Sequence, residues 1–174
     1  APWVNVIQFF SFFTILTNLL VALHYTAVCL GPHEGKFFTK PMVVTAIATY
    51  ITIVGIVYNV ILRPLWDPQG WQKIADETLH SITPAIFILY WITLVDKRGL
   101  NWKNIFSWMI YPIAYLVYTL LRGEFTGRYP YPFVDVVKLG YPVALTNCLF
   151  MSLAFLAISV LFIAIGKALA KANK

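Results

Sequence analysis

The chain has 174 residues, of which 60% are hydrophobic and only 11% are charged, and its formal net charge is +6. Soluble domains are about half apolar and about a quarter charged, so this composition excludes an ordinary soluble domain. No dense basic run interleaved with polar residues occurs in the sequence, which argues against nucleic acid as a partner. The composition therefore predicts an integral membrane protein whose main surroundings are membrane lipid.

Hydrophobic runs follow one another along the whole sequence and are separated by short connections. A membrane-spanning helix needs about 20 mostly apolar residues, and five runs approach or exceed that length. We expect them to be the spans of an all-α transmembrane helix bundle: residues 6–30, 42–62, 78–95, 105–121 and 141–165. Residues 71–77 are expected to form a helical turn at the membrane surface. The connections are too short for a further domain, so we expect residues 1–174 to form a single transmembrane domain.

Lys and Arg are distributed unequally between the two predicted sides of the bundle. The connections 31–41 and 96–104 and the C-terminal end carry eight Lys and Arg residues and two acidic residues. The other side carries five Lys and Arg residues and five acidic residues. Because cytoplasmic loops hold the excess of Lys and Arg, we expect the C-terminus to lie in the cytoplasm and the N-terminus of this chain outside.

Polar side chains inside a membrane are energetically expensive, so each is a functional candidate by default. On the first predicted span, Ser11, Thr14 and Asn18 have the spacing of one helical face. Together with polar residues of the other spans, they fall mainly in the outer half of the bundle. Ordinary hydrogen bonding between helices is the alternative for each of them taken singly. Their convergence in one half of the bundle favours a site.

His80 lies near the outer end of the third predicted span, and Asp76 precedes it by one helical turn. Residues at this spacing face each other on a helix, and a carboxylate there fixes the tautomer and orientation of an imidazole. His80 is then placed to act as a general base toward a hydroxyl group. The spacing alone does not choose among the available hydroxyls, which are Ser11, Thr14, Thr17 and Ser81.

Asn59, Arg122 and Asn147 lie, like His80, within two turns of the outer ends of their predicted spans, and Asn18 lies further along the first span. Any of them is a candidate donor for an oxyanion, and Arg122 is also a candidate partner for a substrate carboxylate. His24 and His33 do not combine with a second ligand at metal-binding spacing. The sequence therefore predicts neither a metal nor another cofactor.

Several segments have a distinctive pattern: FFSFFTILTN at 9–18, LWDPQGW at 65–71, ADETLHS at 75–81, YTLLRG at 118–123 and YPYPF at 129–133. In these segments, and over most of its length, the chain resembles bacterial members of the androgen-induced-protein-like family. Similarity to the eukaryotic members rests on Phe13-Thr14, on His80 with the hydroxyl residue after it, and on residues 131–133. Because members of the family resemble six-span proteins, the resemblance implies a further span ahead of Ala1.

The eukaryotic members of that family are multi-pass hydrolases that cleave fatty-acid esters of hydroxy fatty acids with an intramembrane threonine and a histidine. The resemblance implies that Thr14 is the nucleophile and His80 the base. The eukaryotic pattern has an amide at the position of Asp76, so the role of Asp76 rests on its spacing from His80. We expect a threonine-dependent ester hydrolase of the bacterial cytoplasmic membrane that receives a fatty-acyl ester from the outer leaflet and uses no cofactor.

A second hypothesis comes from a different class of protein. A chain this small, without a soluble domain, also suits a non-catalytic transmembrane subunit of a larger membrane complex. Thr14 and His80 would then be hydrogen-bond partners between helices. Native gel migration in mild detergent separates the two hypotheses, because a subunit runs with its partner membrane proteins.

Overall fold

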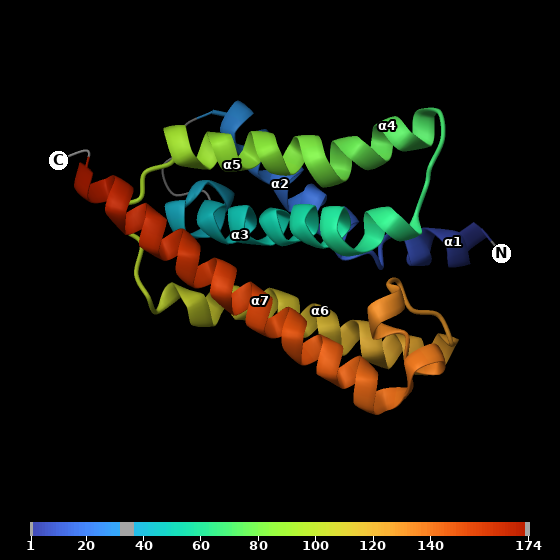
Figure 1. Ribbon diagram of the computed structural model, residues 1–174. Helices are drawn as coiled ribbons and strands as arrows, with labels where there is room; N and C mark the ends of the chain where they lie inside the picture. Colours follow the sequence, from blue (N-terminus) through green and yellow to red (C-terminus); the bar gives the residue numbers. More distant parts are fainter. Residues whose placement is uncertain (1, 32–36, 173–174) are drawn as a thin grey trace.

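The computed structural model describes residues 2–31 and 37–172, and within these ranges every regular element is a helix (Figure 1). The elements η2 and η4 are π-helical turns, and η1, η3 and η5 are short 3-10 turns. In chain order the elements are α1 (Pro2–Phe9), α2 (Phe13–Cys29), η1 (Phe37–Thr39), α3 (Pro41–Val57), η2 (Tyr58–Leu62), η3 (Arg63–Leu65), α4 (Trp71–Glu77), η4 (Thr78–Ile82), α5 (Thr83–Leu94), α6 (Asn104–Thr126), η5 (Pro132–Val134) and α7 (Val136–Ala172).

Three helical stretches among the described residues are long and apolar enough to cross a membrane. They are Pro41–Leu65, Asn104–Thr126 and Val136–Ala172, and a fourth is added if α1 and α2 count as one bent span. The prediction of an all-helical membrane protein is confirmed, whereas the predicted number of five spans is not. The predicted span 78–95 is helical but falls outside this set. Its apolar part, α5, has only 12 residues, and the π-turn η4 and the polar α4 precede it.

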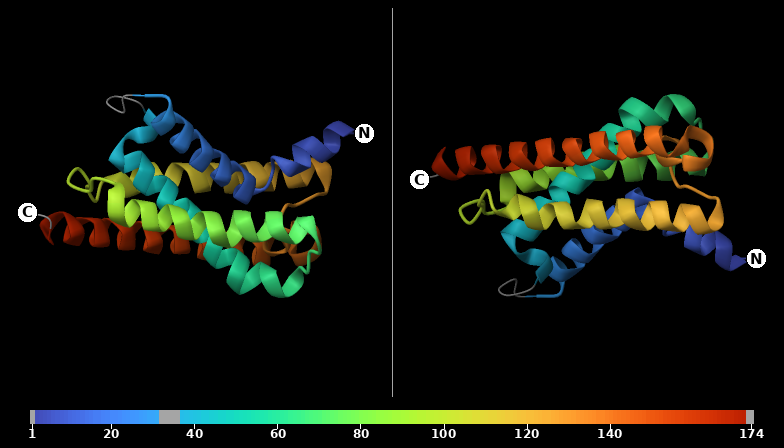
Figure 2. Two further views of the ribbon diagram at one scale, coloured as in Figure 1. Left: turned by 90° about the horizontal axis from the view of Figure 1, so that it is seen from above. Right: turned by 90° about the horizontal axis from the view of Figure 1, so that it is seen from below.

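The predicted first span, 6–30, is not one straight helix. It is broken between α1 and α2, whose axes differ by 72°. Figure 2 shows α1 leading away from the rest of the bundle. Ser11 lies in the break, so the prediction that Ser11, Thr14 and Asn18 share one face of a continuous helix is wrong. Phe12 has extended backbone angles and is the N-cap of α2, which puts Thr14 in the first turn of a new helix.

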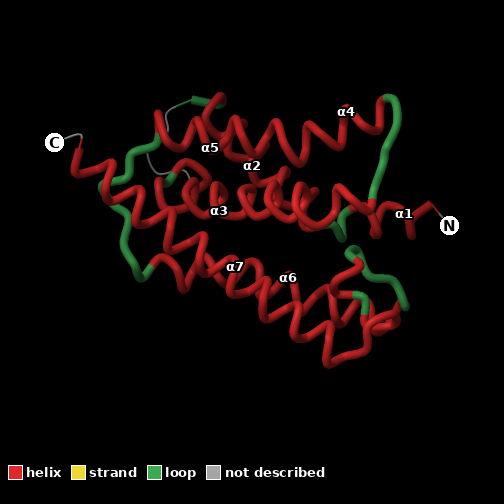
Figure 3. The backbone as a smooth tube through the Cα atoms, in the orientation of Figure 1, coloured by secondary structure: helices red, strands yellow, loops and turns green. Residues whose placement is uncertain are grey.

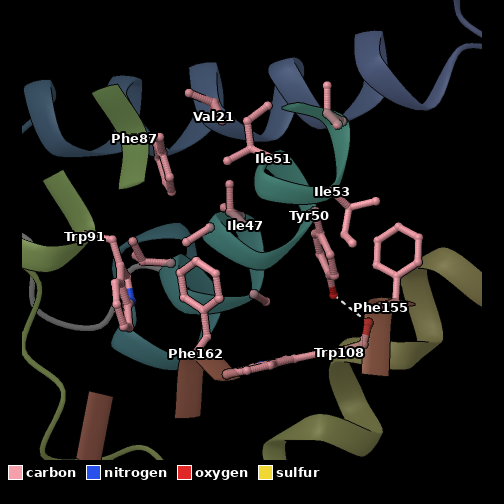
Figure 4. Close-up of a cluster of buried hydrophobic side chains, with 14 of the residues drawn as sticks. Val21, Ile47, Tyr50, Ile51, Ile53, Phe87, Trp91, Trp108, Phe155 and Phe162 are labelled. Atoms are coloured by element: carbon pink, nitrogen blue, oxygen red, sulfur yellow. Dashed lines mark hydrogen bonds between the residues drawn. The ribbon is translucent and has the colours of Figure 1, made fainter. Parts of the chain in front are cut away.

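The central element of the bundle is α3, which contacts α2, α5 and α7. Its sequence is apolar on all sides, as expected for a helix surrounded by protein, and residues such as Ile47 and Ile51 are fully buried. Figure 4 shows these side chains among aromatic rings from the neighbouring helices, with the Tyr50 hydroxyl donating to the Trp108 carbonyl at 2.7 Å. The buried side chains of α3 therefore form the core against which α2, α5 and α7 pack.

The connections lie at two opposite ends of the bundle (Figure 3). One end contains α1, the 66–70 connection and the 127–135 connection, and the other contains the 95–103 connection and the end of α7 (Figures 1 and 2). The sequence pattern assigned these connections to the same two sides when their numbers of charged residues were compared. Of the residues compared there, Glu34, Lys36 and Lys174 lie outside the described residues, and so does His33. At the second end, the Lys97 ammonium donates to the carbonyls of Ile92 and Val95 at the end of α5.

Candidate active site

Thr14, His80 and Asp76 come together at the end of the bundle that contains α1. His80 Nε2 lies 3.2 Å from Thr14 Oγ1, although the two residues are 66 positions apart in the chain. On the other side of the ring, His80 Nδ1 lies 2.9 Å from the Asp76 carbonyl oxygen and 3.2 Å from Asp76 Oδ1. Because a carbonyl oxygen only accepts hydrogen bonds, Nδ1 carries the proton of the neutral ring. Nε2 is then free to accept the Thr14 hydroxyl proton.

Tyr58 supports the imidazole and the carboxylate at the same time. Its ring stacks on His80 with the centroids 4.1 Å apart and the planes 16° from parallel. Its hydroxyl donates to Asp76 Oδ2, so the two carboxylate oxygens are held by Tyr58 and His80. The Arg63 guanidinium lies over the Tyr58 ring and pairs with Glu77 at 2.6 Å. The sequence pattern did not identify Tyr58 as a site residue. The one feature that could have indicated it is its position next to Asn59, near the outer end of the predicted span 42–62.

Both π-turns are part of this arrangement, and a proline follows each of them at the same distance. In η2, the Arg63 amide bonds to the Tyr58 carbonyl, five residues back. In η4, the Thr83 amide bonds to the Thr78 carbonyl in the same way. Proline has no N–H and clashes with the carbonyl four residues earlier, so Pro64 and Pro84 each exclude the regular bond at their own position. The wider turns set the rotation of Tyr58 and His80 toward each other.

A cavity of about 520 Å³ opens beside these side chains. Its lining is mostly apolar and includes Phe12, Leu62, Leu65 and Trp66, and its polar members include Thr14, Tyr58, Asp76, His80 and Tyr131. A much smaller apolar space of about 40 Å³ also has Thr14 and Tyr131 in its lining. Apolar walls with a few convergent polar groups are the usual make-up of a small-molecule site. The cavity is therefore the candidate binding site of the chain.

Of the four candidate hydroxyls, Thr14 is the one that reaches His80. Ser11 donates to the Ile7 carbonyl at 2.6 Å, Thr17 lies 3.4 Å from the Tyr111 hydroxyl, and Ser81 donates to Glu77 at 3.0 Å. None of these three lines the cavity. The choice that spacing left open is thus resolved by distance.

The four residues named as oxyanion or carboxylate partners line neither cavity. The Asn18 amide donates to the Thr14 and Leu79 carbonyls, and so it ties α2 to η4. The other three are used in the same structural way: Asn59 donates to the Gly55 carbonyl, Arg122 to Gln8 Oε1 and Asn147 to the Phe133 carbonyl. The structure brings Asn18 to the Thr14 carbonyl, but it brings none of the four to the Thr14 hydroxyl, whose partners are His80 and Tyr131. The sequence suggested these four residues as oxyanion or carboxylate partners from their predicted depth in the membrane. Depth does not determine the direction in which a side chain leaves its helix.

Tyr131 approaches Thr14 from the 127–135 connection instead. Its hydroxyl oxygen lies 3.3 Å from the Thr14 backbone nitrogen and 3.4 Å from Thr14 Oγ1. The sequence singled this residue out only as part of the segment 129–133. A tyrosine in a connection carries no periodic signal that places it beside a residue 117 positions earlier.

The fold and site together define a helical membrane protein with a buried threonine and a partly buried histidine and aspartate beside a mostly apolar cavity. Comparison of the sequence and structure with protein families, curated proteins and solved structures finds no match. Within residues 2–31 and 37–172, no group of three or more His, Cys, Asp or Glu side chains is arranged to hold a metal ion. The contact between Thr14 Oγ1 and His80 Nε2 is suited to moving a proton between a hydroxyl and an imidazole.

Proposed function

We propose that the chain is an intramembrane lipid-ester hydrolase with Thr14 as nucleophile, His80 as general base and Asp76 as the group that orients His80. The observation that carries the proposal is the 3.2 Å separation of Thr14 Oγ1 and His80 Nε2, with Nδ1 held on Asp76. A nucleophile, a base within hydrogen-bond reach and a third group behind the base are the parts that acyl transfer needs.

The reaction proceeds in two steps. As Thr14 Oγ forms a bond to the ester carbonyl carbon, its proton moves to His80 Nε2 and the carbonyl π electrons move onto the carbonyl oxygen. When that electron pair returns, the ester C–O bond breaks and His80 gives its proton to the departing alcohol oxygen, which leaves an acyl-Thr14. Water then attacks the acyl carbon while His80 takes its proton, and the free acid leaves as Thr14 regains a proton from His80.

The substrate class we propose is a fatty-acyl ester, such as an ester of a hydroxy fatty acid. The apolar lining of the cavity, with Phe12, Leu65 and Trp66, supports an acyl chain as its occupant. The resemblance to the androgen-induced-protein-like family, seen in segments that include Thr14 and His80, supports the same class. In this proposal the chain is a bacterial member of that family.

For the membrane arrangement we propose five spans, with α1 and α2 as one bent span and α4, η4 and α5 as the third. The C-terminal end of α7 lies in the cytoplasm, and the cavity opens toward the outer leaflet of the cytoplasmic membrane. The excess of Lys and Arg at the C-terminal end of the bundle supports this orientation.

The test is hydrolysis of p-nitrophenyl esters of fatty acids by the purified protein, together with labelling by a fluorophosphonate probe. We expect Thr14→Ala to abolish both, because it removes the attacking oxygen. Thr17→Ala is the matched control, since Thr17 is also a buried threonine of α2 but lies outside the cavity. Equal labelling of wild type and Thr14→Ala would contradict the proposal. Migration of an inactive wild type within a large native assembly would favour the subunit hypothesis instead.

A further inference from the structure

The phenol of Tyr131 is the polar group of the 127–135 connection that lies closest to Thr14. Its oxygen is 3.4 Å from Thr14 Oγ1, and Tyr131 lines the cavity together with Thr14 and His80. The ring is held between two others: Phe133 stacks on it at 5.2 Å and Phe12 meets it edge-on at 5.7 Å. The hydroxyl is therefore fixed in position before any ligand enters.

The hydrogen bonds at Thr14 determine to which group the Tyr131 hydroxyl can donate. Thr14 lies in the first turn of α2, where backbone N–H groups have no partner within the helix. The Thr14 N–H donates to the Tyr131 oxygen at 3.3 Å and therefore occupies a lone pair of that oxygen. The phenol proton of Tyr131 then points toward another acceptor. Burial raises the pKa of Tyr131, which keeps that proton on the oxygen at neutral pH.

We propose that Tyr131 is a catalytic residue that donates its phenol proton in a hydrogen bond to the carbonyl oxygen of the ester that Thr14 attacks. The inference rests on the proposed function and adds the electrophilic partner which that function lacks. As the bond between Thr14 Oγ and the ester carbon forms, the carbonyl oxygen takes up an electron pair. A hydrogen-bond donor about 3 Å away stabilises this oxygen. No proton is transferred from Tyr131; its O–H stabilises the charge that develops.

The same role is not open to the donors that the sequence suggested. The side-chain N–H groups of Asn18 and Asn147 donate to backbone carbonyls, and that of Arg122 donates to Gln8. None of these residues lines the cavity. Tyr131 is both on the cavity wall and within hydrogen-bond distance of the attacking oxygen.

The decisive variant is Tyr131→Phe, which removes one oxygen and keeps the ring that packs against Phe12 and Phe133. Tyr111→Phe is the matched control, because the Tyr111 hydroxyl also lies 3.4 Å from a threonine Oγ1, that of Thr17, yet lines no part of the cavity. We expect Tyr131→Phe to lower kcat about 10²- to 10³-fold with little change in KM. We expect Tyr111→Phe to hydrolyse p-nitrophenyl fatty-acid esters like wild type.

A second readout does not depend on the folded fraction of the variant. Each protein is assayed with an oxygen ester and with the matched thiono ester, in which the carbonyl oxygen is sulfur and is a poor hydrogen-bond acceptor. A lost donor at the carbonyl lowers the oxygen-to-sulfur rate ratio, and we expect this decrease in Tyr131→Phe and not in Tyr111→Phe. A ratio unchanged from wild type overturns the assignment, whatever the absolute rate.

The outcomes separate the two proposals. If Thr14→Ala is inactive and Tyr131→Phe keeps both the wild-type rate and the wild-type ratio, Tyr131 is not the donor but the threonine hydrolase stands. If Thr14→Ala hydrolyses the ester as well as wild type does, the proposed function fails and the role of Tyr131 fails with it.

Discussion

Asp76 is the residue on which the geometry of the candidate site depends most. Its carbonyl oxygen and Oδ1 both face His80 Nδ1, and its Oδ2 accepts from the Tyr58 hydroxyl. A carboxylate held at both oxygens has one orientation, and it transmits that orientation to the imidazole. Tyr58 adds a second constraint because its ring lies flat against His80. The direction of Nε2 toward Thr14 is therefore set by contacts at the Nδ1 edge of the imidazole and on one of its faces.

Removing only the Tyr58 hydroxyl tests this coupling. Tyr58→Phe keeps the ring stacked on His80 but leaves Asp76 Oδ2 without its phenol donor. We expect kcat/KM for ester hydrolysis to fall about tenfold, which corresponds to about 1.4 kcal/mol of transition-state stabilisation. Steady-state kinetics on purified protein measure this. Tyr118→Phe is the control, since the Tyr118 hydroxyl bonds to Ser11 outside the cavity; an equal loss in both variants would contradict a specific role for Tyr58.

At the scale of the elements, two prolines decide how the site is built. Pro64 and Pro84 each follow a π-turn, and these two turns present Tyr58 and His80 to each other. The close approach of the two helices is possible because Gly55 has no side chain: a Cβ there would lie 3.3 Å from Pro84 Cβ and 3.4 Å from the His80 carbonyl oxygen. Gly55, Pro64 and Pro84, which are unfavourable inside a regular helix, thus help to bring Tyr58 and His80 together.

Pro84→Ala is expected to restore the regular helical bond from residue 84 to the His80 carbonyl and to close the π-turn. Closing it rotates His80 away from Thr14, so ester hydrolysis should fall at least tenfold, about 1.4 kcal/mol in the barrier. Thermal stability should not decrease, because proline inside a helix is itself unfavourable and alanine keeps the Cβ that packs at Gly55. Pro142→Ala in α7, away from both cavities, is the control. Full activity in Pro84→Ala would show that the π-turn is not needed.

At the scale of the whole molecule, the bundle is asymmetric both in packing and in charge. More than half of the most apolar part of Pro41–Leu65 is buried, whereas less than a third of the most apolar parts of α6 and α7 is buried. These exposed faces are suited to contact with lipid, because apolar surface of this extent is unfavourable in water. The site lies at the end of the bundle that contains α1, and the last turns of α7 lie at the other end (Figure 1). The function therefore depends on which end faces which side of the membrane.

Cysteine labelling in intact cells tests the proposed orientation. After Cys29 and Cys148 have been replaced by alanine, single cysteines are introduced at Lys138, near the site end, and at Lys171, near the end of α7. We expect a membrane-impermeant maleimide to label Lys138→Cys and to label Lys171→Cys only after lysis, as the excess of Lys and Arg at the C-terminal end predicts. The reverse pattern would contradict the orientation and would turn the cavity toward the cytoplasmic leaflet.

Composition and hydropathy were sufficient to predict the helical membrane fold, because both are local properties that a bilayer selects directly. The pairing of Asp76 with His80 was also predictable, since it depends only on one turn of helix. The break in the first predicted span could not be predicted, because no Pro or Gly occurs near Ser11 to indicate it. The predicted count of five spans was not confirmed, because the apolar part of the third predicted span is short and is preceded by the π-turn η4.

The sequence by itself therefore determined the class of protein, the helical composition and the local carboxylate–imidazole pair. Only the tertiary structure decided that Thr14 rather than Ser11, Thr17 or Ser81 faces His80, and that Tyr58 and Tyr131 complete the surroundings. The physical reason is that these contacts join residues far apart in the chain. Their directions depend on a helix break, two π-turns and the rotation of each helix around α3, which packing determines and residue spacing does not.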